Sequence, residues 1–400
     1  MGMNEEKGAK ATLAVCSVGY GIQAIINCFA PLLFLTFQKT YNVSLTDITL
    51  LITINFCVQL CIDLASAVFI DKIGYRASAI LAHVFAGTGL LCMAILPEIL
   101  PDPYIGLIIS VVIYALGGGL LEVLLSPIVE ALPMKNKDKI MSLLHAAYCW
   151  GSVSVIFVST VFFKIFGIEN WKILTYLWTV VCVCNLIAFC KVPIYDLIAE
   201  NEKGYSFIEL IKKPLFWLLF IVMLCAGASE HAVAQWASTF AEQGLQVNKT
   251  IGDLAGPMFF AVLMGISRTW YGKQEGKTDL SKTMIGSGIG CVLSYLLIGL
   301  STNPLLSLLG CGLSGFFVGI MWPGTFSIAS KLIRKGGTMM FSFFALAGDL
   351  GCSSGPALAG FVAELNKHDL QRGILSAVLF PLVLVLVIYI VRKHYEENAV

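Results

Sequence analysis

Long apolar stretches, separated by short polar or Gly/Pro-containing segments, make up most of this chain. A helix needs about 20 apolar residues to cross the hydrocarbon core of a bilayer. The stretches lack the period-two alternation that is typical of membrane β-strands. They therefore predict an all-α membrane fold with twelve transmembrane helices. The predicted spans lie near residues 11–38, 46–70, 77–98, 104–131, 140–166, 171–190, 214–242, 251–271, 283–301, 305–331, 338–364 and 370–391.

The composition excludes a soluble globular protein. Hydrophobic residues make up 58% of the chain, charged residues make up 13%, and the mean hydropathy is +0.84. A soluble domain is about half apolar and a quarter charged, so this surface needs lipid around it. There is no basic tract that would suggest a nucleic-acid partner. The thirteen cysteines lie almost all inside apolar stretches, where we expect packing residues and no metal site.

The distribution of basic residues predicts the orientation in the membrane. If the N-terminus is cytoplasmic, 20 of the 26 Lys and Arg residues fall in inside segments and 6 fall outside. Cytoplasmic segments of membrane proteins carry an excess of Lys and Arg. We therefore expect a multi-pass protein of the cytoplasmic membrane with both termini in the cytoplasm.

One polar stretch divides the twelve spans into two sets of six. Residues 191–213 carry seven charged side chains after Lys191 itself and form a predicted cytoplasmic linker. The expected domains are an N-terminal six-helix bundle, 1–190, and a C-terminal six-helix bundle, 214–400.

The two halves also share a local pattern. Gly119 precedes Pro127 by eight residues in predicted span 4, and Gly315 precedes Pro323 by the same number in predicted span 10. Such repeated patterns are typical of transporters built from internal repeats, whose substrate site lies at the repeat interface near the bilayer midplane. They predict two pseudo-symmetric bundles around a central solute path.

The loop between predicted spans 2 and 3 carries a recognisable motif. It reads Ala67-x-x-x-Asp71-Lys72-x-Gly74-x-Arg76 and resembles the signature loop of the major facilitator family, with Ala67 in place of the family's glycine. The resemblance implies a gating role for Asp71, Gly74 and Arg76.

Two further residues are assigned to the gates. Arg268-x-x-x-Gly272-Lys273, after predicted span 8, resembles a weaker second copy of the signature loop. Glu130 lies near the cytoplasmic edge of predicted span 4, where we expect a salt-bridge partner.

Predicted span 4 resembles one branch of that family more closely. Gly117-Gly118-Gly119-Leu120-Leu121-Glu122-x-x-x-Ser126-Pro127 is similar to the Gly-x-Gly-x-x-Glu-x-x-x-Asn-Pro pattern of the fucose/galactose/glucose:proton symporters. By resemblance, Glu122 couples protons and contacts sugar. Ser126 stands where the branch has an asparagine.

Predicted span 7 adds a second acidic candidate. Gly227-Ala228-Ser229-Glu230-His231, followed by Trp236, is similar to a Gly-Ala-Glu segment with a downstream Trp in the same branch. We therefore assign proton coupling to Glu230 as well. Predicted span 1 lacks the carboxylate of the fucose permease, and its nearest polar groups are Gln23 and Asn27.

Polar groups inside the spans need an explanation. A charged side chain at the bilayer centre costs at least about 2.5–3.5 kcal/mol, and a carboxyl in a low-dielectric site can be neutral near pH 7. Apolar sugar faces stack on aromatic rings, while carboxylates and amides bind hydroxyls. The competing interpretation is that these groups pack or bond helices together. The candidate substrate-binding residues are Gln23, Asn27, Gln59, Glu122, His145, Tyr148, Trp150, Glu230, His231, Gln235, Trp236, Trp322 and Asp349.

These patterns favour a secondary active transporter of a sugar or similar small polar metabolite. We expect proton-coupled symport by alternating access, with sodium as the other possible coupling ion, in a monomer that needs no cofactor. The alternative is an exporter or drug/proton antiporter of the same fold. Drug antiporters usually carry a Gly-Pro-rich motif in span 5, where this chain has HAAYCWGSVS. An enzyme is not favoured, because no nucleophile comes with a positioned base.

Overall fold

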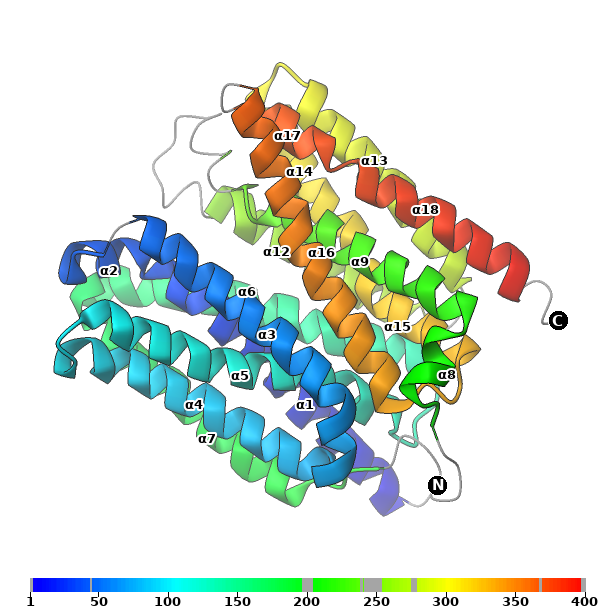
Figure 1. The fold of residues 1–400 in the computed structure, drawn as a ribbon, viewed down its shortest axis with the longest axis horizontal. Helices are drawn as coiled ribbons and strands as arrows, with labels where there is room; N and C mark the ends of the chain where they lie inside the picture. The colour runs from blue at the N-terminus through cyan, green and yellow to red at the C-terminus, as the bar shows by residue number, and fades with distance from the viewer. Residues whose placement is uncertain are drawn as a thin grey trace. The chain divides into compact units, whose positions relative to one another are not determined.

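The computed structural model describes residues 3–43, 45–195, 204–237, 240, 254–274, 279–366 and 369–396. Over these residues every regular element is a helix (Figure 1). The first elements are α1 (Met3–Leu32), α2 (Phe34–Tyr41), α3 (Leu45–Ile73), α4 (Tyr75–Ile99), α5 (Pro103–Glu130), α6 (Lys137–Phe166), η1 (Ile168–Asn170), α7 (Trp171–Lys191) and α8 (Phe207–Ile211). The others are α9 (Pro214–Ala234), η2 (Leu254–Met258), α12 (Phe259–Lys273), α13 (Leu280–Leu300), α14 (Pro304–Val318), α15 (Met321–Leu332), α16 (Gly337–Leu365), α17 (Leu370–Ser376), α18 (Leu379–Val391) and η3 (Arg392–Glu396).

The predicted twelve-helix membrane fold is confirmed. Within the described residues, nine helical segments are long and apolar enough to cross a bilayer. The other three spans correspond to α3, to η2 with α12, and to α16. Within the described side chains of α3, Thr53–Ser66 forms a shorter apolar helical stretch.

Several helices begin where the sequence supplies a cap. Asp102 accepts a hydrogen bond from the backbone N–H of Tyr104 at the start of α5, 2.9 Å away, and Pro103 occupies the first helical position. Asn303 and Pro304 repeat this arrangement at α14. A capping side chain satisfies one of the free N–H groups at a helix start, and proline there loses no intrahelical bond. The predicted spans begin close to these caps.

Among the described residues, three of the predicted spans are each divided into two helices, which differs from expectation. The breaks fall at Leu33 between α1 and α2, at Gly319 and Ile320 between α14 and α15, and between α17 and α18. A proline lies close to each break, and proline removes a backbone N–H from the helical ladder.

The helices form two compact units. The first contains residues 1–134 and 150–200, and the second contains 135–149 and 201–400. In the first, α5 packs against α4, α3 and α1, and α4 also packs against α7 (Figure 1). In the second, α9 packs against α16 and α18, and α13 packs against α14. The domain boundaries expected from sequence stay a prediction, and residues 196–203 of the expected linker lie outside the described residues.

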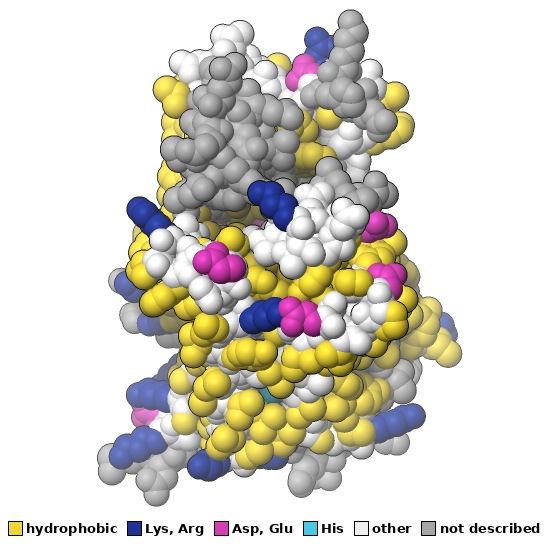
Figure 2. All heavy atoms as spheres, turned by 90° about the vertical axis from the view of Figure 1, so that its left-hand side faces the viewer, with side chains coloured by type: hydrophobic (Ala, Val, Ile, Leu, Met, Phe, Trp, Pro, Cys, Tyr) yellow, Lys and Arg dark blue, Asp and Glu magenta, His cyan; other side chains and the backbone are white. Residues whose placement is uncertain are grey.

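The outer surface is apolar, as a lipid environment requires. On α7, Ile173, Leu177 and Val180 are each more than half exposed, whereas Leu174 and Cys182 on the other side of the helix are buried. On the face drawn in Figure 2, hydrophobic side chains cover broad areas between a few scattered charged ones.

Candidate functional site

The first unit brings four predicted site residues together on three helices. On α1, Gln23 donates a hydrogen bond from Nε2 to Oε2 of Glu122 on α5, at 2.6 Å. Gln59 on α3 donates from Nε2 to Oδ1 of Asn27 on α1, at 3.4 Å. Gln23 and Gln59 are buried and Glu122 is half-buried. We call these four residues the Glu122 cluster. It gathers a carboxyl group and three amides inside the predicted membrane span.

The glycines of residues 117–119 explain why these helices meet so closely. An ideal Cβ on the first glycine would lie 2.5 Å from the backbone nitrogen of Ala86 on α4. On the second it would lie 3.3 Å from Cγ2 of Ile26 on α1, and on the third 3.2 Å from Cα of Gln59 on α3. Three successive glycines therefore face three different helices. Small residues at helix contacts let backbones approach closely, and here they set α5, with Glu122, against α1 and α3.

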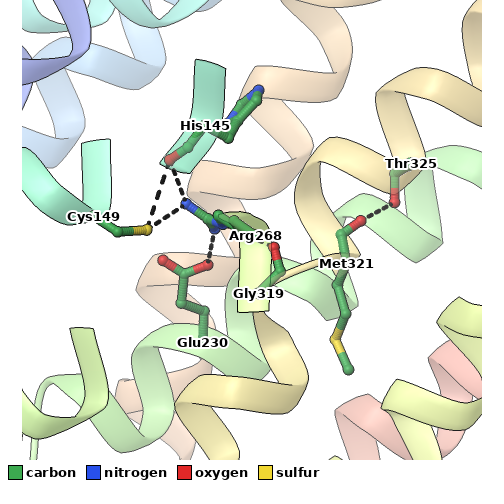
Figure 3. A network of polar contacts seen from close by, with 7 residues as sticks. All are labelled: His145, Cys149, Glu230, Arg268, Gly319, Met321 and Thr325. Carbon is green, nitrogen blue, oxygen red and sulfur yellow. Dashed lines mark hydrogen bonds and ion pairs between the residues drawn. The ribbon is translucent and has the colours of Figure 1, made fainter. Parts of the chain in front are cut away.

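The second unit holds a buried ion pair. Nη2 of Arg268 on α12 lies 3.1 Å from Oε2 of Glu230 on α9. Both residues are buried, with 2% and 6% of their surface exposed. The same guanidinium donates from Nε to the carbonyl of Gly319 at 2.7 Å. It also donates from Nη1 to the His145 carbonyl and to Cys149 Sγ, both at 3.1 Å (Figure 3). All its donor nitrogens therefore have acceptors, as a buried guanidinium requires.

The position of Arg268 differs from the sequence expectation. The resemblance to the signature loop placed this residue after span 8, whereas the structure buries it inside α12, five residues before the helix ends at Lys273. Ser142 Oγ also donates to the Arg268 carbonyl at 2.7 Å. Glu230, which lies 38 residues earlier, is the partner that makes burial of this charge possible.

Other candidates in the second unit lie against α16. Trp236 donates from Nε1 to the Pro356 carbonyl at 3.1 Å. Trp322 is buried with its ring against Gly348, next to the buried Asp349. Both rings are therefore fixed by α16.

The remaining substrate-site candidates have varied surroundings. His231 and Tyr148 are half-buried, and Gln235 is exposed. His145 is buried, and its ring stacks on that of Phe326 with centroids 5.9 Å apart. Trp150 lies in the first unit and is 40% exposed.

The signature-loop residues have structural roles at helix ends. Gly74 has a φ of +86°, a conformation that favours glycine, and it precedes α4. Arg76 donates from Nη1 to the Phe189 carbonyl at 2.6 Å and from Nη2 to the Val192 carbonyl at 2.8 Å. It therefore caps the C-terminus of α7, where a cation is favourable. Asp71 lies in the last turn of α3, and its side chain is outside the described part of the structure. Glu130 is the half-buried last residue of α5.

Sequence reasoning missed Cys149 and Gly319 as partners of Arg268. Pro323 was a usable signal for the second of these, because a proline frees the carbonyl four residues earlier. The described residues contain no group of three or more His, Cys, Asp or Glu side chains that could hold a metal ion.

Comparison with protein families identifies the chain. The family model for the Major Facilitator Superfamily matches residues 13–356. The chain belongs to the Major Facilitator Superfamily. It is thus a multi-pass membrane transporter, and the resemblance seen in its motifs is confirmed at the level of the family.

Solved structures of Major Facilitator Superfamily proteins share the fold. The E. coli fucose:proton symporter FucP matches with a TM-score of 0.78 and 15% identity, over 94% of this chain and 98% of FucP. The proton:xylose symporter XylE matches with a TM-score of 0.80 and 12% identity, over 98% and 96%. The human organic anion transporter MFSD10 matches with a TM-score of 0.75 and 14% identity, over 95% and 99%. A comparison with curated protein sequences found no significant match.

Proposed function

We propose that this chain is a proton-coupled symporter that imports a sugar or a similar small polar metabolite by alternating access. The observation that carries the proposal is Glu122, a carboxyl group set inside a membrane helix and bonded to the neutral amide of Gln23. The proton-symport names of FucP and XylE agree with this assignment. In the proposed orientation both termini are cytoplasmic, in line with the distribution of Lys and Arg.

Protonation of Glu122 would change the hydrogen bonds within the Glu122 cluster. An ionised carboxylate only accepts hydrogen bonds, and a protonated carboxyl also donates one. Gln23 Oε1 is buried and accepts no hydrogen bond among the described residues, so the amide can turn and accept from protonated Glu122. The amides of Asn27 and Gln59 add donors and acceptors for substrate hydroxyls. Protonation thereby changes which hydrogen-bond donors and acceptors of the cluster are available to a polyol.

Glu230 is the second proposed coupling residue. Its partner Arg268 carries a full positive charge, so a proton on Glu230 competes directly with a guanidinium. The aromatic rings of Trp236 and Trp322 supply surfaces on which an apolar sugar face can stack.

The test is transport by purified protein in proteoliposomes. Monosaccharides, glycosides and organic acids are offered under an imposed pH gradient, with a sodium gradient as the parallel arm. We expect pH-driven accumulation of a polar substrate by the wild type. Glu122→Gln should lose that accumulation and keep counterflow exchange, because the amide cannot carry a proton.

Glu98→Gln is the matched control, since Glu98 is an exposed carboxylate at the end of α4 that pairs with Lys172. It should accumulate substrate like the wild type. Accumulation that is unaffected by Glu122→Gln would remove this residue from the coupling. Substrate movement opposite to the proton gradient would favour the antiporter instead.

A further inference from the structure

The interruption of span 10 leaves a specific carbonyl group without a donor in its own helix. Between α14 and α15, the helical hydrogen-bond ladder is interrupted at Gly319 and Ile320, although both residues keep right-handed helical backbone angles. Pro323 has no backbone N–H, so the Gly319 carbonyl four residues earlier cannot receive a helical hydrogen bond. Arg268 Nε supplies that bond from α12 at 2.7 Å (Figure 3). The carbonyl left without a helical donor at the break is therefore hydrogen-bonded by a side chain from another helix.

Packing holds α12 against the same point. An ideal Cβ on Gly319 would lie 3.0 Å from Cβ of Ser267 and 3.1 Å from the carbonyl of Met264. A larger residue would push α12 away from the break. The absence of a side chain at Gly319 thus keeps its carbonyl within reach of Arg268.

The guanidinium of Arg268 that donates a hydrogen bond to the Gly319 carbonyl also forms the ion pair with Glu230. Nε and Nη2 lie in one rigid plane, and a guanidinium cannot lose its proton in a protein. Its orientation depends on where its counter-charge lies. When Glu230 is ionised, attraction at 3.1 Å helps to hold the plane, and Nε then points at Gly319. When Glu230 is neutral, that attraction is lost while the guanidinium keeps its charge.

We propose that Arg268 is a positioning residue that transmits the charge of Glu230 to the break in span 10. Ionised Glu230 fixes Arg268 on the Gly319 carbonyl and keeps α15 in one orientation relative to α14. A proton on Glu230 releases Arg268, and α15 can then bend about Gly319 and Ile320. The inference rests on the proposed proton-coupling role of Glu230.

Among the residues that the structure describes, three other titratable groups interact with this pair. His231 follows Glu230 on α9 and interacts electrostatically with both members of the pair. His145 and Cys149, in the segment 135–149, interact with Arg268, and Cys149 interacts with Glu230 as well. Variants His145→Gln and His231→Gln therefore accompany the test. A pH response that survives both histidine substitutions and is absent from Glu230→Gln is assigned to Glu230.

The experiment is amide hydrogen exchange of the full chain in detergent, followed in peptides that cover residues 314–327. It is performed below and above neutrality and corrected for the intrinsic pH dependence of exchange. We expect exchange there to be about tenfold faster at acidic pH, a change of about 1.4 kcal/mol in the free energy of local opening, because the Gly319 carbonyl then loses its hydrogen bond to a charged group. Glu230→Gln should exchange fast at both pH values. Arg268→Gln should also exchange fast at both pH values. Arg268→Lys replaces Arg268→Gln in the test if the glutamine variant does not fold.

Pro323→Ala distinguishes a specific link from general destabilisation. It restores a backbone N–H at residue 323 that can donate to the Gly319 carbonyl. The double variant Arg268→Gln with Pro323→Ala should therefore regain slow, pH-independent exchange. Pro356→Ala makes the same chemical change inside α16 and should not restore protection. Equal exchange in the wild type and Arg268→Gln, or failure of Pro323→Ala to restore it, overturns the inference.

Exchange and transport are read separately. If uptake in proteoliposomes is independent of the proton gradient while exchange behaves as described, the proposed function fails and the link from Glu230 to the break stands. If uptake is proton-driven and exchange does not respond, the link fails and the proposed function stands.

Discussion

The two units each place a glutamate inside the membrane, but they give it different partners. Glu122 is half-buried and receives a hydrogen bond from the neutral amide of Gln23. Glu230 is buried and paired with the charged guanidinium of Arg268. An amide can adjust to either protonation state of its partner, whereas a buried guanidinium needs a negative charge nearby. The comparison predicts that the first site tolerates neutralisation and that the second depends on its charge.

The largest expected effect is on the stability of the second unit. Glu230→Gln or Arg268→Gln should each lower the free energy of unfolding by about 3–5 kcal/mol, because each leaves an uncompensated buried charge or its acceptors unpaired. Glu122→Gln should change it by no more than about 1 kcal/mol, because a neutral hydrogen bond can replace the original. Thermal unfolding in detergent, with a ligand-free protein, measures both.

A double variant sharpens this contrast. Glu230→Met with Arg268→Met removes both charges and should recover part of the loss, leaving about 1–3 kcal/mol for the unsatisfied Gly319 carbonyl. Equal losses from Glu122→Gln and Glu230→Gln would remove the distinction between the two sites.

An intermediate effect is expected where α5 meets α4. Gly117→Ala puts a methyl group 2.5 Å from the Ala86 nitrogen, so the two backbones must separate, at a cost of about 1–3 kcal/mol. Gly21→Ala is the control, because an ideal Cβ at Gly21 has nothing within 4 Å. Melting temperatures compare the two variants. If they melt alike, the close approach of α5 to α4 at Gly117 does not stabilise the first unit.

The smallest effect concerns the amide itself. Gln23→Met keeps the side-chain length but removes the donor to Glu122, and we expect a loss of about 0.5–1.5 kcal/mol. The loss is small because half-buried Glu122 can take up water. Gln235→Met, at an exposed glutamine, should leave the melting temperature unchanged. A loss as large as that of Arg268→Gln would show that Glu122 is as dependent on its partner as Glu230.

The helices were predictable because lipid imposes a length and a polarity on every span. Predicted spans 77–98 and 171–190 agree with α4 and α7 to within two residues. The interruption of span 10 was not predicted, although Pro323 had been noted as part of the repeat. A continuous apolar stretch hides such a break, because hydrophobic length alone does not record where backbone donors are missing.

The side-chain pairs were less accessible to sequence reasoning. Glu122 and Glu230 were identified from motifs, but their partners depend on helix packing across 99 and 38 residues. Arg268 was assigned to a loop because Arg268-x-x-x-Gly272-Lys273 resembles a second copy of the signature loop. Its counter-charge, Glu230, lies on another helix and allows Arg268 to be buried. The local sequence around Arg268 does not reveal this pairing.

The cap that Arg76 provides also has a consequence for biosynthesis. Its acceptors include the Phe189 carbonyl, 113 residues further along the chain. At a synthesis rate of about 5–20 residues per second, a ribosome needs roughly 6–23 s to cover that distance. Arg76, at the start of α4, therefore reaches these carbonyls only after α4, α5, α6 and α7 have been inserted, and the cell's insertion machinery has to tolerate an unfinished bundle until then.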